Sequence, residues 1–201
     1  MKEYPIDFWN GRYKSASYIY GTEPNEFFRK QLEKLKVGSI LLPAEGEGRN
    51  AVYAAGQGWS VTAFDRSTIG REKALRLALN KKVSLTYEVA DVMEFQTTQR
   101  FDVLGLMYAH FPKQIRKQAY QNLLGFLKPE AKVIFEAFAK EQLENSSGGP
   151  KNLDMLFSIE EIRNEFSGLK FEFLEQQTIK LDEGEHHQGK AEVIRFVGIK
   201  K

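Results

Sequence analysis

Short apolar runs and longer amphipathic stretches alternate along the first two thirds of the chain. The apolar runs are almost continuous and rich in β-branched and aromatic residues, which is typical of strands buried on both faces of a parallel sheet. They span residues 39–44, 60–65, 83–89, 101–108 and 132–138. Between them, the stretches 50–58, 68–82 and 112–129 show helical spacing or end in glycine or proline. This alternation predicts a doubly wound α/β sheet.

The last quarter of the chain has a different pattern. Residues 158–166 open with Ser158 and carry Glu161 three positions later, a capping box that predicts a helix. Two long alternating runs follow, 170–182 and 190–200, on either side of a turn that contains glycine. Such a pair predicts an antiparallel hairpin at the end of the sheet.

A charged helical segment, residues 23–36, precedes the first strand, and we expect Pro24 in its first turn. The 201 residues, 42% of them hydrophobic, suffice for one domain with a sizeable core and are few for two. We therefore expect a single domain, with a helical N-terminal lid over 1–37 and an α/β core over 38–201 that ends in the hairpin.

Charge and hydropathy limit the partners. The 29 basic and 27 acidic side chains nearly balance, and no basic arm is present, so we expect no nucleic-acid partner. No apolar run approaches the ~20 residues that span a membrane, so we expect no membrane partner. A small-molecule substrate and a monomer or homodimer are the remaining expectation.

The chain contains no cysteine, which excludes disulfides, thiolate metal sites and a cysteine nucleophile, and which fits a cytoplasmic protein. His186 and His187 are adjacent near the hairpin turn. Adjacent side chains there point apart, and the sequence offers no third ligand. We interpret both as turn residues and expect no metal site.

A glycine-containing loop, "AEGEGRNA" over 44–51, follows the first predicted strand. In a doubly wound sheet such a loop binds a ligand at the carboxyl ends of the strands. Asp65 ends the second predicted strand, where a carboxylate can accept hydrogen bonds from both hydroxyls of a ribose. The combination indicates a nucleoside ligand; the alternative is a tight turn and a solvated aspartate.

The loop carries two glutamates, Glu45 and Glu47. A pyrophosphate at this helix N-terminus would be repelled by them, by a few kcal/mol at short range. S-Adenosylmethionine has a sulfonium and an ammonium and no phosphate, so the glutamates favour it over a dinucleotide. The sequence also lacks the Tyr-x-x-x-Lys pair of one large class of dehydrogenases.

Six segments together resemble a known family: 9–28, 44–55, 61–67, 90–95, 127–138 and 146–162. Over nearly its full length the chain resembles class I S-adenosylmethionine-dependent methyltransferases. Within them it is similar to the tellurite-resistance group and, more distantly, to thiopurine S-methyltransferases. The resemblance implies a Rossmann-like, seven-stranded sheet of order 3-2-1-4-5-7-6 whose last strand is antiparallel.

The resemblance also implies a cofactor site. The methionine part would lie against the loop, the ribose on Asp65, and the adenine beside Arg66. Residues 20–25 would cover the site. The residues expected to bind the cofactor are Ala44, Glu45, Gly46, Gly48, Asp65, Arg66, Ala90, Asp91, Val92 and Met107.

The loop departs from the family pattern at two positions. Leu42 stands where a carboxylate is usual, and Ala44 replaces the first glycine. Our hypothesis is that Glu45 contacts the cofactor's ammonium instead; the alternative is that Glu45 points to solvent. Arg49 opposes the dipole of the helix it begins. We expect its partner to be Glu47, Glu26 or the substrate.

Methyl transfer from a sulfonium is a direct displacement, so the protein mainly aligns the reacting atoms. A base is needed only if the acceptor carries a proton. The candidate catalytic residues are His110, Tyr108 and Tyr20. His110 is either a base or substrate donor, or a cap of the next helix. Tyr20, together with Tyr18, could attract the sulfonium through its ring face, or both could simply pack in the lid. Glu136 is either a substrate contact or a salt-bridge residue.

Three functions fit the sequence. The first is methyl transfer to a small acceptor such as a chalcogen oxyanion or a thiol. The second is a protein that binds S-adenosylmethionine or S-adenosylhomocysteine with little catalysis, and the third is an NAD(P)-dependent oxidoreductase.

Overall fold

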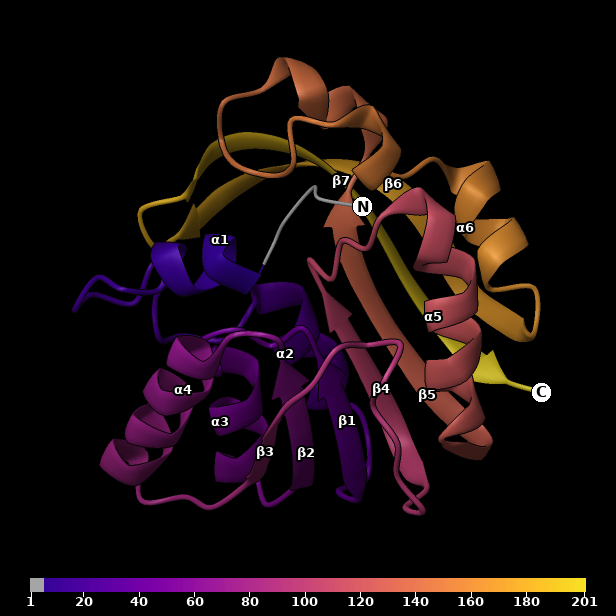
Figure 1. The fold of residues 1–201 in the computed structure, drawn as a ribbon. Helices are drawn as coiled ribbons and strands as arrows, with labels where there is room; N and C mark the ends of the chain where they lie inside the picture. The colour runs from indigo at the N-terminus through magenta and orange to yellow at the C-terminus, as the bar shows by residue number, and fades with distance from the viewer. Residues whose placement is uncertain (1–5) are drawn as a thin grey trace.

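The computed structural model describes residues 6–201, so residues 1–5 of the expected lid lie outside the described part of the chain. Seven strands form one sheet of order β3-β2-β1-β4-β5-β7-β6 (Figure 1). The strands are β1 (Ser39–Pro43), β2 (Ser60–Asp65), β3 (Thr86–Val89), β4 (Phe101–Met107), β5 (Leu127–Phe138), β6 (Leu169–Glu183) and β7 (His187–Lys200). Strand β7 runs antiparallel to both neighbours, whereas the pairs among β1–β5 are parallel. The predicted fold class and strand order are confirmed.

Helices cover both faces of the sheet. They are α1 (Ile6–Arg12), α2 (Glu26–Leu32), α3 (Arg49–Gly56), α4 (Thr68–Lys81), α5 (Lys113–Gly125) and α6 (Ile159–Glu165), with short 3-10 helices at η1 (Lys140–Glu144) and η2 (Leu153–Met155). Helices α5 and α6 pack on one face, while α2, α3 and α4 pack on the other (Figure 1). Strand β1 contributes to both, with Leu41 in one hydrophobic cluster and Ile40 and Leu42 in the second. Burial on both faces explains the continuous apolar runs of the central strands.

Strand β1 lies between β2 and β4, which is where the connections reverse direction across the sheet. The loops after β1 and β4 therefore diverge and leave a crevice at the carboxyl ends of the strands. The structure thus places the glycine loop and the β4 loop at the two sides of one opening.

Several elements begin at residues other than those predicted. Strand β3 begins at Thr86, and β5 begins at Leu127, so Pro129 lies within a strand and not at a helix end. The pairing of β4 with β5 changes register between Phe101 and Val103 of β4, opposite this part of β5. A proline is tolerated at such an irregularity in a ladder. Pro24 precedes α2 because Asn25 is the cap, its side chain accepting a hydrogen bond from the Phe28 amide at 2.8 Å.

The capping box of α6 is present as predicted, with Ser158 and Glu161 each accepting from the other's backbone amide. No helix in the described part of the chain is both long enough and apolar enough to cross a membrane.

Gly48 lies so close to α4 that a side chain has no room there. It caps α3 in the left-handed region at φ 87°, and a Cβ there would lie 2.4 Å from the Cβ of Ala74 in α4. We expect Gly48→Ala to lower the free energy of unfolding by about 1–3 kcal/mol, because the substitution adds both backbone strain and overpacking. Urea unfolding measures the change.

Gly56 is the matched control. It ends the same helix, and a Cβ there would meet nothing within 4 Å. Gly56→Ala should leave stability unchanged or raise it by up to ~1 kcal/mol. Equal stabilities of the two variants would contradict the close packing of α3 on α4.

Candidate functional site

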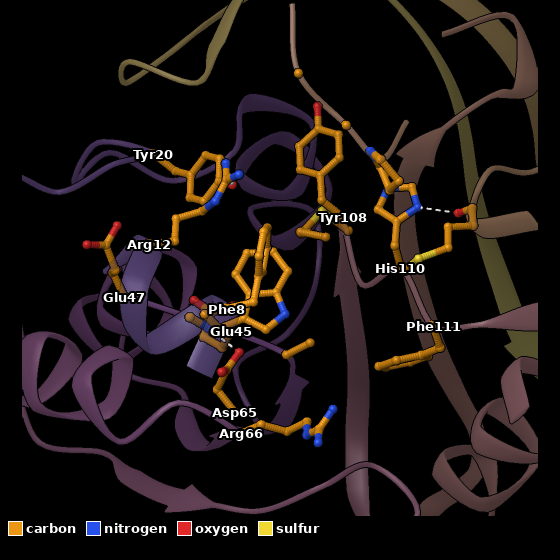
Figure 2. Close-up of a pocket in the computed structure, with 18 of the residues that line it drawn as sticks. Phe8, Arg12, Tyr20, Glu45, Glu47, Asp65, Arg66, Tyr108, His110 and Phe111 are labelled. Atoms are coloured by element: carbon orange, nitrogen blue, oxygen red, sulfur yellow. Dashed lines mark hydrogen bonds between the residues drawn. The ribbon is translucent and has the colours of Figure 1, made fainter. Parts of the chain in front are cut away.

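A cavity of about 1100 Å³ lies at the carboxyl ends of the strands. Its walls come from the loops after β1, β2, β4 and β5, from α1, and from the β6–β7 turn. It is as large as the upper range of small-molecule sites, so it can hold two molecules side by side. Figure 2 shows Asp65 and Arg66 at one end of it and Tyr20, Tyr108 and His110 toward the other.

The loop after β1 turns sharply because three of its residues are left-handed: Ala44 at φ 51°, Gly46 at 59° and Gly48 at 87°. Neighbouring strands hold this turn in place. The Gly46 amide donates to Asp65 at 3.0 Å, and the Tyr87 hydroxyl donates to the Gly46 carbonyl at 2.6 Å. Ala44 and Gly46 line the cavity, whereas Gly48 lies against α4.

Glu45 folds back over the N-terminus of α3. Its carboxylate accepts a hydrogen bond from the Ala51 amide at 2.7 Å and one from the Asn50 side chain at 3.4 Å. Burial raises the pKa of Glu45 to about 7. The alternative that Glu45 points to solvent is wrong. A helix amide that could bind a phosphate is occupied by this carboxylate, which disfavours a dinucleotide here.

Glu47 has a structural role. It forms a buried ion pair with Lys73 of α4 and accepts a hydrogen bond from the Ile19 amide at 2.8 Å. The Lys73 ammonium also donates to the Ser15 and Ser17 carbonyls, at 2.9 and 2.6 Å. Glu47 therefore attaches the N-terminal segment to α4 and does not act on a ligand, whereas the contact of Glu45 with a ligand stays a prediction.

Asp65 lies at the end of β2, where both carboxylate oxygens accept from backbone amides: Ser67 at 2.8 Å and Gly46 at 3.0 Å. Burial raises the pKa of Asp65. Arg66 lies 3.1 Å from Asp91 in an ion pair. These side chains line the cavity together with Ala90, Val92 and Met107.

Arg49 is paired with a residue that the sequence analysis did not consider. Its guanidinium lies 2.9 Å from the Glu183 carboxylate at the end of β6 and donates to the Tyr20 carbonyl at 3.3 Å. Glu47 and Glu26 were wrong as partners because the hairpin folds back over α3, and a contact between Arg49 and the substrate stays a prediction. Arg49 thus connects the glycine loop, the N-terminal segment and the hairpin.

Tyr108 and Tyr20 lie in an aromatic group at the other end of the cavity. The Tyr108 ring is 4.7 Å from Phe138 and 4.6 Å from His187, and the Tyr20 ring is 4.6 Å from His187. Burial and the carboxylates of Glu136 and Glu183 raise the pKa of Tyr108. Its buried hydroxyl makes no well-formed hydrogen bond to the described residues. This hydroxyl can therefore bind a ligand.

His110 is held by the last residue of η2. Its Nδ1 lies 2.7 Å from the Met155 carbonyl, and the Phe138 amide lies 3.4 Å from Nε2 (Figure 2). Burial lowers the pKa of His110 to about 4, so the ring is neutral at neutral pH. It does not cap α5, since that helix begins after Pro112 without a side-chain cap.

Glu136 in β5 is fully buried and forms an ion pair with Arg195 of β7. It also accepts a hydrogen bond from the Asn25 side chain. Of the two interpretations of Glu136, the structure supports the salt bridge.

His187 is the cavity residue that the sequence analysis missed. It is the first residue of β7, only 5% exposed, and its Nδ1 lies 3.0 Å from the Glu183 carboxylate. The alternation of side chains along β7 could have identified it. His187 lies on the same face of the strand as the buried Ala191 and Val193, which predicts that it is buried too. No group of three or more metal-binding side chains occurs among the residues that the structure describes.

Comparisons with known proteins agree with this geometry. Residues 40–130 match the family described as a methyltransferase domain. A search of curated protein sequences gave no significant match.

Three solved structures illustrate the shared fold. The first, reported for the conversion of a disulfide bond into a thioacetal group during echinomycin biosynthesis, has a TM-score of 0.77 at 17% identity over 94% of this chain and 88% of the other. TehB from Haemophilus influenzae has a TM-score of 0.74 at 12% identity over 98% and 67%. The N-methyltransferase NodS from Bradyrhizobium japonicum WM9, in complex with S-adenosyl-L-homocysteine, has a TM-score of 0.70 at 11% identity over 97% of each chain. The chain thus contains a methyltransferase domain over residues 40–130, in a fold that it shares with these structures.

Proposed function

We propose that this chain transfers the methyl group of S-adenosylmethionine to a small-molecule acceptor by direct displacement. The observation that carries the proposal is one continuous cavity with carboxylates at one end and an aromatic group at the other. A donor bound at the first end and an acceptor at the second would meet near Met107, which ends β4, and Tyr108, which follows it.

The residues of the first end fit the cofactor. Asp65 would accept hydrogen bonds from the ribose, and Glu45 would face the ammonium of the methionine part. The adenine would lie between the Arg66–Asp91 pair and the side chains of Ala90 and Val92. When bound, the cofactor supplies a methyl group already activated by a positively charged sulfur.

The second end would hold and align the acceptor. Tyr20 and Tyr108 present ring faces that attract a sulfonium. His110 is neutral, so it would orient the acceptor without adding charge. The resemblance to tellurite-resistance and thiopurine methyltransferases supports a chalcogen oxyanion or a thiol as acceptor, and a cytoplasmic place of action remains a prediction.

A second candidate function is cofactor binding with little catalysis. Leu42 supports it, because this residue replaces a family carboxylate and is buried in the core at 1% exposure. Turnover of the donor with any acceptor would exclude it.

Calorimetric titration of the purified protein tests the cofactor. We expect S-adenosylmethionine and S-adenosylhomocysteine to bind and NADH not to bind, since Glu45 occupies an amide that could otherwise bind a phosphate of the dinucleotide. Tight NADH binding, or no binding of either methionine nucleoside, would overturn the proposal.

The pH dependence of binding tests Glu45. Its pKa of about 7 means that the free carboxyl holds its proton below that pH. Because the cofactor's ammonium attracts the ionised form, binding should weaken as pH falls, approaching a tenfold loss of affinity per pH unit below about pH 6. Titrations between about pH 5 and pH 8 measure this slope.

Glu45→Gln is the matched variant, since an amide oxygen can still accept from the Ala51 amide. We expect it to weaken S-adenosylmethionine binding by about 10- to 100-fold at pH 8, which corresponds to the free energy of one charge-assisted hydrogen bond. We also expect the affinity of the variant to be independent of pH over this range. Glu88→Gln, an exposed position outside the cavity, should change neither. Wild-type affinity in Glu45→Gln would rule out the contact.

A further inference from the structure

We propose that His187, oriented by Glu183, is the general base that takes a proton from the methyl acceptor, and that the acceptor is therefore a neutral proton-bearing nucleophile such as a thiol. This inference rests on the proposed methyl transfer and deepens it, because it assigns a catalytic residue and a class of substrate to the aromatic end of the cavity.

The first observation is the geometry of the pair. Glu183 ends β6 and His187 begins β7, and the two face each other across the hairpin turn. The carboxylate lies 3.0 Å from Nδ1 of the imidazole. A carboxylate in this position keeps the proton on Nδ1, which leaves the lone pair on Nε2. Nε2 makes no hydrogen bond to the described residues, so it is available to a ligand.

The carboxylate is itself held in place. The Arg49 guanidinium lies 2.9 Å from it, and the Asn25 side chain donates to its other oxygen at 3.1 Å. These contacts come from α3 and from the cap of α2, two elements distant in sequence from the hairpin. The histidine and the arginine lower the pKa of Glu183 to about 2, so it is ionised at every pH at which the enzyme would work.

The imidazole lies inside the cavity wall. It packs among the rings of Tyr20, Tyr108 and Phe138. A Cβ on Gly148 would lie 2.8 Å from Cδ2 and 3.4 Å from Nε2, so only glycine allows this loop to approach the ring. The Tyr108 hydroxyl lies in the same aromatic group, close to the Glu136 carboxylate, and would provide a second polar contact for an acceptor.

The charged side chains that act on His187 are paired, which suits a neutral acceptor. Glu183 in β6 and Glu136 in β5 are its neighbouring anions, and Arg49 in α3 is its neighbouring cation. Glu183 is paired with Arg49, and Glu136 is paired with Arg195. The other titratable side chains near the ring are Tyr20, Tyr108, His110 and His186, and Arg12 of α1 donates to the Tyr20 hydroxyl at 3.4 Å. Burial lowers the pKa of His187 despite Glu183, so the ring is neutral and basic at neutral pH.

The proposed step balances. Nε2 of His187 takes the proton of the acceptor's S–H bond, and the sulfur lone pair forms the new bond to the methyl carbon. The carbon–sulfonium bond breaks, and its electron pair remains on the leaving sulfur as a thioether. The products are a methyl thioether, S-adenosylhomocysteine and an imidazolium that releases its proton to water.

A pair of thiol probes tests the base. Benzyl mercaptan is protonated at neutral pH, whereas benzenethiol is largely ionised there and needs no base. With S-adenosylmethionine as donor, His187→Gln should lower kcat for benzyl mercaptan about 10²-fold and change kcat for benzenethiol less than about threefold. Lys190→Gln, at an exposed position of the same strand that does not line the cavity, should behave as wild type. Equal loss with both thiols, loss with neither, or no wild-type turnover of benzyl mercaptan would overturn the proposal.

Nitrogen-15 spectra of the imidazoles give a readout that does not depend on turnover. In the S-adenosylhomocysteine complex we expect His187 to carry its proton on Nδ1, and benzyl mercaptan to shift Nε2. In Glu183→Gln the pKa of His187 should fall, because the anion that favours the imidazolium is gone, and the acid limb of kcat should move to lower pH by the same amount. A proton on Nε2 in the wild type, or an unchanged pKa in the variant, would refute the positioning role of Glu183.

These outcomes separate the two proposals. Absence of binding of the methionine nucleosides in calorimetry refutes the proposed function. Binding and methyl transfer that proceed equally in wild type and His187→Gln refute only the role of His187.

Discussion

The carboxylate of Glu183 is the contact on which the arrangement of the site depends. It binds Arg49 at the start of α3, His187 at the start of β7 and the side chain of Asn25, which caps α2. These groups come from three parts of the chain that have no local reason to meet. Removing one member of such a buried pair typically costs about 3–5 kcal/mol, because the other charge is left without a partner. The hairpin, the N-terminal segment and the glycine loop are therefore held as one unit around the cavity.

Glu45 and Glu47 show how two residues of one type, two positions apart, acquire different roles. Glu47 has an ammonium within reach and a backbone amide to accept from, so it joins the N-terminal segment to α4. Glu45 has only amide donors, and burial leaves its pKa near 7. A carboxylate without a cation at the edge of a cavity is suited to a positively charged ligand, which fits the proposed methyl donor.

The two ends of the cavity differ in their chemistry for a structural reason. Strands β1 and β2 end in loops whose amides are satisfied by Asp65, so that end is polar and rigid. The other end is built from β4, β5 and the hairpin, whose aromatic side chains pack on one another. The structure therefore separates the place suited to the charged donor from the place suited to an acceptor, and His187 lies in the second.

The sequence by itself determined the strands, the terminal hairpin and the segment that carries the loop. Continuous apolar runs require burial on both faces, and the long alternating runs at the end require an antiparallel hairpin, so local patterns were sufficient. The order of the strands came from the resemblance to methyltransferases, whereas Asp65 could be placed at the end of a strand from the pattern alone. The partners of Arg49, Glu47 and Glu136 could not, since each is paired with a residue from a distant segment. His187 was assigned to the turn because the hairpin boundary was placed three residues too late. Only the tertiary structure decided these contacts, because charge pairing depends on which distant elements meet in space, and the sequence pattern of each element does not encode that.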